Sequence, residues 1–81
     1  MNEIKEFVLE YIQREYALPD DINVMEFNYI DSGYVDSLGL IQFIATLEDE
    51  FDIFFSDDDL QNPDIRIIGK LIEIIYNKTN E

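Results

Sequence analysis

Ser37 is the residue whose type and setting are best suited to chemistry. It stands in the string GYVDSLGL, residues 33–40, directly after Asp36 and at the start of an apolar periodic segment. A nucleophilic serine needs a base, and the chain contains no histidine. The nucleophile elbow G-x-S-x-G is not matched either, because Val35 occupies the first glycine position. Ser37 is therefore not expected to attack a substrate by itself, and its plainest role is to support Asp36 in capping a helix.

The composition removes other kinds of chemistry. With no cysteine and no histidine, the chain has neither a thiolate nor an imidazole with which to bind a metal or transfer a proton. The acidic run Asp57-Asp58-Asp59 lacks the spacing of an EF-hand loop, and we interpret it as the first turn of a helix. The sequence therefore predicts a protein that is not an enzyme and has no metal site.

The charge indicates which partners suit the chain. Five Lys and Arg residues stand against nineteen Asp and Glu residues, and the formal net charge is -14. Such a field repels nucleic acids and anionic lipids and favours basic protein surfaces. No apolar stretch approaches membrane-spanning length, and no basic segment precedes an apolar run at the N-terminus. We expect a cytoplasmic monomer that binds no nucleic acid and does not insert into membranes.

The pattern of apolar residues predicts a single all-α domain over residues 1–81, a small bundle of three longer helices and one short helix. The first helix has Asn2 as a candidate N-cap and ends near Leu18-Pro19. A long connection follows, from about Ala17 to Val35. It holds so many large apolar side chains that we expect it to be ordered and packed across the bundle.

The second helix should begin at Asp36 or Ser37 and end near Glu50, with Asp36 as its N-cap. We place the following residues on its apolar side: Leu38, Ile41, Ile44, Ala45 and Leu47. In the next connection, Ile53 and Phe55 should enter the core. A short helix is capped by Ser56 and ends near Gln61, and a last helix runs from about Ile65 to Asn77, with Asp64 as its candidate cap.

Several of these segments, taken in order, resemble the acyl carrier protein family. They are a helix of about fifteen residues, a long loop, GYVDSL at 33–38, LEDEF at 47–51, DDDL at 57–60 and NPDIRIIG at 62–69. Each segment alone is weak evidence for the family, but their order and separations in a chain of this length make the resemblance specific. The resemblance covers most of the chain and implies a free-standing, phosphopantetheine-dependent carrier protein.

The resemblance implies a role for each residue around Ser37. A separate phosphopantetheinyl transferase would attach 4'-phosphopantetheine from coenzyme A to Ser37, and the arm would hold acyl, aminoacyl or polyketide intermediates as thioesters. Asp36 would cap the helix and contribute to recognition by the transferase, and Leu38 would lie beside the attachment point. Basic patches on cargo-loading ligases or synthases would dock on the second helix and its surroundings, at Gly39, Leu40, Gln42, Glu48, Asp49 and Phe54.

Three points stay open at this level. Gly39 is either a tolerated glycine in a first turn or a gap left for a partner. Phe54 contacts a partner, lines a cargo pocket or, as we favour, packs against the long loop. Gly39 and Gln42 stand where fatty-acid-synthesis carriers commonly have acidic residues, which favours a dedicated pathway. The alternative function is an unmodified, carrier-like module for protein–protein interaction.

Overall fold

The computed structural model describes the backbone of residues 2–19 and 21–79 and the side chains of residues 3–19 and 21–79. Its α-helices are α1 (Asn2–Tyr16), α2 (Ser37–Phe51), α3 (Asp57–Gln61) and α4 (Ile68–Thr79), and two 3-10 helices are η1 (Val24–Glu26) and η2 (Pro63–Arg66). The described residues form no strand, and the predicted bundle of three longer helices and one short helix is confirmed.

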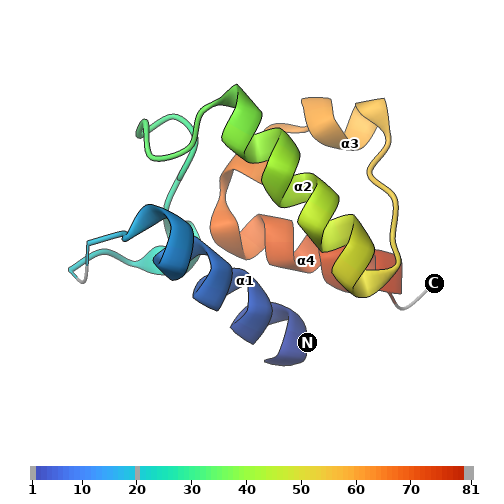
Figure 1. Cartoon of the computed structure of the whole chain (residues 1–81), viewed down its shortest axis with the longest axis horizontal. Coiled ribbons are helices and arrows are strands. Elements are labelled where there is room, and N and C mark those ends of the chain that lie inside the picture. Colours follow the sequence, from blue (N-terminus) through green and yellow to red (C-terminus); the bar gives the residue numbers. More distant parts are fainter. Residues whose placement is uncertain (1, 20, 80–81) are drawn as a thin grey trace.

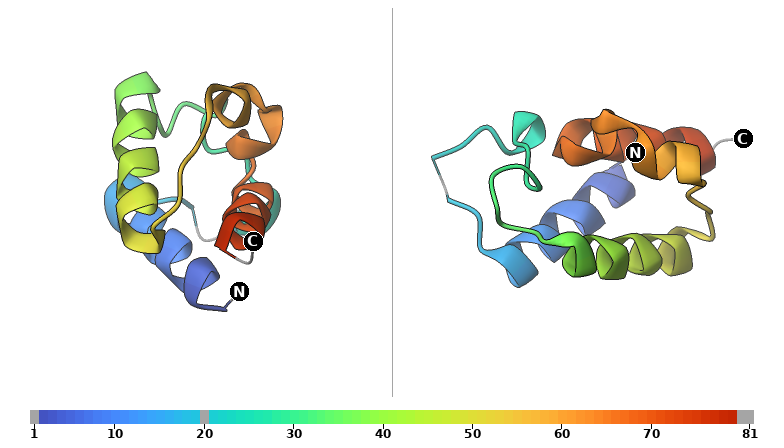
Figure 2. Two further views of the ribbon diagram at one scale, coloured as in Figure 1. Left: turned by 90° about the vertical axis from the view of Figure 1, so that its right-hand side faces the viewer. Right: turned by 90° about the horizontal axis from the view of Figure 1, so that it is seen from above.

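Helix α2 and the pair α3–α4 lie on opposite sides of the molecule, and α1 crosses the bundle obliquely (Figures 1 and 2). Large apolar side chains from each element fill the space between them. Apart from Tyr29, the buried residues are aliphatic or phenylalanine. They are Ile4, Val8, Ile12, Leu18, Val35, Phe43, Ile44, Leu47, Phe55, Ile65, Ile68, Leu71, Ile72 and Ile75.

Helix α1 ends at Tyr16, slightly earlier than the end near Leu18-Pro19 that the sequence predicted. Ala17 adopts a left-handed conformation with φ of 49°, and its N–H donates to the Gln13 carbonyl at 3.1 Å. This closes the helix before Leu18, whose side chain enters the core. The backbone of Asn2 lies within α1, and its side chain is outside the described part, so its capping role stays a prediction.

The long connection between α1 and α2 is ordered over its described residues, as predicted. Tyr29 is fully buried, and its hydroxyl donates a 2.7 Å hydrogen bond to the Ile65 carbonyl. An isolated antiparallel bridge joins Asn28 to Ile67, and the N–H of Ile68 donates to the Phe27 carbonyl at 3.2 Å. The connection is thus tied to the segment that leads into α4.

The last helix begins later than the sequence predicted. Ile65 belongs to η2, whose cap is Asn62, and α4 starts only at Ile68. The bonds to Phe27 and Asn28 explain the delay, because they hold Ile67 in an extended conformation. Asp64 is therefore not the cap of α4; it lies in η2 and pairs with Lys70 at 3.6 Å.

Candidate functional site

Ser37 is the first residue of α2, and its side chain is exposed. Asp36 is the N-cap: its backbone is extended, and its Oδ1 accepts a 2.7 Å hydrogen bond from the N–H of Gly39. The Asp36 carbonyl also accepts from the N–H of Leu40 at 2.9 Å. The predicted start of the helix and its cap are thus confirmed, and they place the Ser37 hydroxyl at the positive end of a fifteen-residue helix.

The last turn of α1 supports this end of α2. The Tyr16 hydroxyl oxygen lies 3.5 Å from the Gly39 carbonyl oxygen. Burial, followed by the neighbouring Tyr11, Glu15 and Asp36, raises the pKa of Tyr16 to about 12. The phenol therefore stays neutral at ordinary pH and can donate toward the backbone of α2.

A Cβ atom at Gly39 would point into the protein. It would lie 3.1 Å from Asp36 Oδ1, 3.3 Å from Val35 Cγ1 and 3.7 Å from the Tyr16 hydroxyl. These distances give Gly39 a packing role against Asp36 and Val35 that neither interpretation had named, and they agree better with a glycine of the first turn. Gly39 is itself half-buried, and a role for it in contact with a partner stays a prediction.

An open groove of about 500 Å³ begins at Ser37 and continues between α2 and the segment that leads into α3. One wall is α2, and the other is residues 54–60. The lining is mostly apolar and consists of Ser37, Leu40, Ile41, Ile44, Ala45, Glu48, Phe54, Phe55, Asp57 and Leu60. The exposed serine therefore lies at one end of a hollow that can hold apolar groups.

The buried side of α2 differs from the one predicted. Ile44 and Leu47 are buried as expected, but Leu38 is 63% exposed and Ile41 65% exposed, and Ala45 is exposed too. Phe43, which the sequence analysis did not place on the apolar side, is fully buried. Its ring stacks on Tyr11 with centroids 4.7 Å apart, and this aromatic contact turns Phe43 and Leu47 toward the core. The stripe with Leu38, Ile41 and Ala45 is left facing outward.

Phe54 also differs from the interpretation that we favoured. Its side chain is 74% exposed and lines the groove, so it does not pack against the long loop. Phe55 is buried and Ile53 packs against the core, as the alternation predicted. Leu60, which the sequence analysis did not single out, is exposed at the same groove. No periodicity marked Leu60, since α3 has only five residues.

The remaining residues expected at a partner surface divide into two groups. Gln42 and Asp49 are exposed on α2. Leu40 is half-buried in the groove, and Glu48 is half-buried with its Oε2 accepting a 2.9 Å hydrogen bond from the N–H of Phe55. Glu48 therefore holds the opposite wall of the groove, a structural role that the sequence did not indicate.

The surroundings of Ser37 are acidic and apolar. Arg14, Arg66, Lys70 and Lys78 each pair with a carboxylate, and neither these residues nor Lys5 lines the groove.

Within residues 2–19 and 21–79, no helix has the length and apolar character needed to cross a membrane. The same residues contain no group of three or more acidic side chains placed to hold a metal ion.

Comparison with known proteins agrees with this geometry. A family model described as a phosphopantetheine attachment site matches residues 6–72. The D-alanyl carrier proteins of Streptococcus sanguinis and Streptococcus mutans are 31% and 32% identical to the chain over 78 residues, which are 96% of this chain and 98% of each relative.

An acyl carrier protein of Buchnera aphidicola subsp. Acyrthosiphon pisum is 31% identical over 78 residues, covering 96% of this chain and 95% of the relative. No solved structure gives a significant match. The family match spans most of the chain, and the relatives align over nearly their whole length. The chain therefore belongs to the family of carrier proteins that contain a phosphopantetheine attachment site.

Proposed function

We propose that this chain carries acyl, aminoacyl or related intermediates as thioesters on a 4'-phosphopantetheine arm attached to Ser37. The observation that carries the proposal is the position of Ser37. This exposed serine is the first residue of a long helix and lies at one end of an apolar groove. The first-turn N–H groups and the helix dipole favour an anion, so a phosphodiester suits this residue.

The residues around Ser37 fit such a group. No hydrogen bond in the described part of the chain engages the Ser37 hydroxyl, which leaves it accessible to a transferase. Asp36 holds the first turn through its bond to Gly39, and the groove beside Ser37 offers apolar surface to the arm and its cargo. When bound, the arm supplies a thiol, which the polypeptide lacks because it contains no cysteine.

The chain itself is a passive carrier in this proposal. A phosphopantetheinyl transferase and cargo-loading enzymes supply the chemistry, and we expect them to approach with basic surfaces, since the net charge is -14. Exposed Gln42, Asp49 and Phe54 are available for such docking. We expect the chain to act as a cytoplasmic monomer.

The residues near Ser37 favour a carrier that serves one dedicated pathway. The exposed stripe next to it is made of Leu38, Ile41 and Ala45, and the polar position between them is uncharged Gln42. Partners of this surface therefore need apolar contacts next to the attachment point in addition to basic residues around it. The relatives include both D-alanyl and acyl carriers, and both kinds of cargo remain within the proposal.

The absence of cysteine gives a direct test. After incubation with coenzyme A and a broad-specificity phosphopantetheinyl transferase, and after removal of free coenzyme A, titration of thiols should give one thiol for each chain. The Ser37→Ala variant should give none. An absence of thiol in the folded wild-type chain with several transferases would contradict the proposal and favour an unmodified interaction module.

A further inference from the structure

The outer wall of the groove is a short segment with little secondary structure of its own. It consists of the connection after α2 and the five-residue α3, and it contributes Phe54, Asp57 and Leu60 to the lining. A helix of five residues is too short to be stable alone. Its position must therefore come from the contacts that attach it to α2 and α4.

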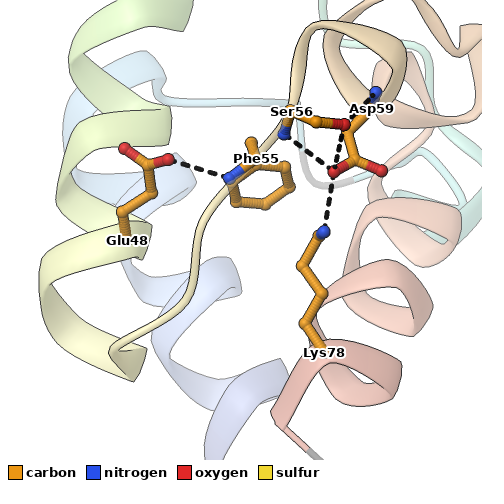
Figure 3. Close-up of polar contacts among 5 residues, drawn as sticks. All are labelled: Glu48, Phe55, Ser56, Asp59 and Lys78. Carbon is orange, nitrogen blue, oxygen red and sulfur yellow. Dashed lines mark hydrogen bonds and ion pairs between the residues drawn. The ribbon is translucent and has the colours of Figure 1, made fainter. Parts of the chain in front are cut away.

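One oxygen atom, Asp59 Oδ2, links the cap of α3 to α4 (Figure 3). It accepts from the N–H of Ser56 at 2.9 Å and from the Ser56 hydroxyl at 3.0 Å, while the N–H of Asp59 donates back to that hydroxyl at 3.2 Å. This is a capping box that closes the N-terminus of α3. The same oxygen accepts a 2.7 Å bond from Lys78 Nζ, in the last turn of α4.

The Asp59–Lys78 pair differs from the other ion pairs of the chain. The Lys78 side chain is 21% exposed and that of Asp59 is 27% exposed, whereas in the other three ion pairs among the described residues the side chains are 47% to 66% exposed. A shielded, hydrogen-bonded pair holds its geometry better than an exposed one. The Lys78 ammonium also lies 5.5 Å from the centre of the Phe55 ring, so it contacts the wall at two residues.

On the α2 side, the same wall is held by Glu48. Its Oε2 accepts from the N–H of Phe55, the residue whose ring lies under Lys78. The wall is thus fixed to α2 by Glu48 and to α4 by Lys78, and both attachments meet at residues 55–59 (Figure 3). Phe54 and Leu60, which stand at either end of this short stretch, are exposed and make up the apolar lip of the groove.

We propose that the Asp59–Lys78 pair is a latch that holds the outer wall of the groove against the bundle, and that its opening controls how quickly apolar groups leave the groove. With the pair formed, Phe54 and Leu60 face α2 across a groove of fixed width. With the pair broken, α3 keeps its own cap but loses its attachment to α4, and the wall moves. If the chain is a carrier, as proposed above, the departing group is the thioester-bound cargo. The latch itself does not depend on that proposed function.

The test compares the unmodified wild-type chain with Lys78→Met, which keeps the apolar stem and removes the ammonium. Asp59→Asn removes the charge while leaving an oxygen that can accept from Ser56. The matched control is Lys70→Met, which removes another lysine of α4 and breaks the exposed pair with Asp64. The first readout is amide hydrogen exchange, and the second is the release rate of the neutral apolar probe N-phenyl-1-naphthylamine.

In both latch variants, exchange over residues 55–61 and release of the probe should become about three- to tenfold faster than in the wild type. Exchange in α1 should stay unchanged, which shows that the fold is intact. The double variant should be no faster than the single variants, because each removes the same contact. Lys70→Met should behave like the wild type.

Equal rates in Lys78→Met and wild type would overturn the latch, as would equal acceleration by Lys70→Met or a wild-type chain that does not bind the probe. Since no arm is present in these experiments, their result is independent of whether Ser37 is modified. Failure of the latch and failure of the carrier proposal are therefore distinguished by this test and by the thiol titration.

Discussion

Two adjacent side chains, Asp36 and Ser37, have separate tasks at the start of α2. The carboxylate of Asp36 turns inward to the N–H of Gly39, while the hydroxyl of Ser37 is left exposed. The sequence predicted this division because an aspartate before an apolar periodic segment is a strong helix N-cap. It also predicted Ser37 as the modified residue, but only through the family resemblance, since an exposed serine in a first turn is common.

Substitutions at Asp36 should separate its two suggested roles. Asp36→Ala removes the cap and should lower the free energy of unfolding by about 1 kcal/mol. Asp36→Asn keeps a good cap and should leave that free energy nearly unchanged. Urea denaturation measures the stability, and the rate of modification of Ser37 measures transferase recognition. A normal rate in Asp36→Asn would show that the negative charge of Asp36 is not needed by the transferase.

At the scale of elements, helix starts with a local cap were predictable, whereas the buried face of α2 and the start of α4 were not. The cap residues Asp36 and Ser56 correctly marked the starts of α2 and α3. The orientation of α2 depends on Phe43 meeting Tyr11 from α1, and the start of α4 depends on Phe27 from the long connection. Both are contacts between distant segments, which periodicity within one segment cannot reveal.

Two helical glycines allow a matched prediction about how α4 packs. A Cβ atom at Gly69 would lie 2.6 Å from the Met25 carbonyl oxygen, a backbone atom that cannot turn aside. Gly69→Ala should therefore lower the free energy of unfolding by about 1–3 kcal/mol. At Gly39 the nearest atoms belong to side chains at 3.1 Å or more, so Gly39→Ala should have a clearly smaller effect. Equal effects in urea denaturation would contradict the close approach of α4 to η1.

For the whole molecule, charge is the dominant property. The formal net charge is -14, and within residues 3–19 and 21–79 ion pairs engage Arg14, Arg66, Lys70 and Lys78. This leaves a largely uncompensated acidic surface around an apolar groove, a combination suited to partners that are basic around an apolar contact. The total charge is read directly from composition, whereas the pairing of Asp59 with Lys78 is set by the tertiary fold.

That pair predicts a specific dependence of stability on pH. The hydrogen bond from Lys78 lowers the pKa of Asp59 below the usual value for aspartic acid. A carboxyl group with a lower pKa in the folded chain stabilises the fold above its unfolded pKa and loses that effect as the pH falls through its folded pKa. The wild type should therefore be more stable than Lys78→Met at neutral pH, and the difference should narrow as the solution is acidified below the usual pKa of aspartic acid. A difference that does not change with pH in urea denaturation would contradict the pair.

The most direct test of the central claim is the intact mass of the chain before and after incubation with coenzyme A and a phosphopantetheinyl transferase. Ser37→Ala tests the attachment residue, and Ser32→Ala serves as control because Ser32 is also exposed and lies five residues earlier. We predict one phosphopantetheine-sized increment on the wild type and on Ser32→Ala, and no increment on Ser37→Ala. An increment that persists in Ser37→Ala, or none on the folded wild type with several transferases, would contradict the assignment of Ser37 as the attachment residue.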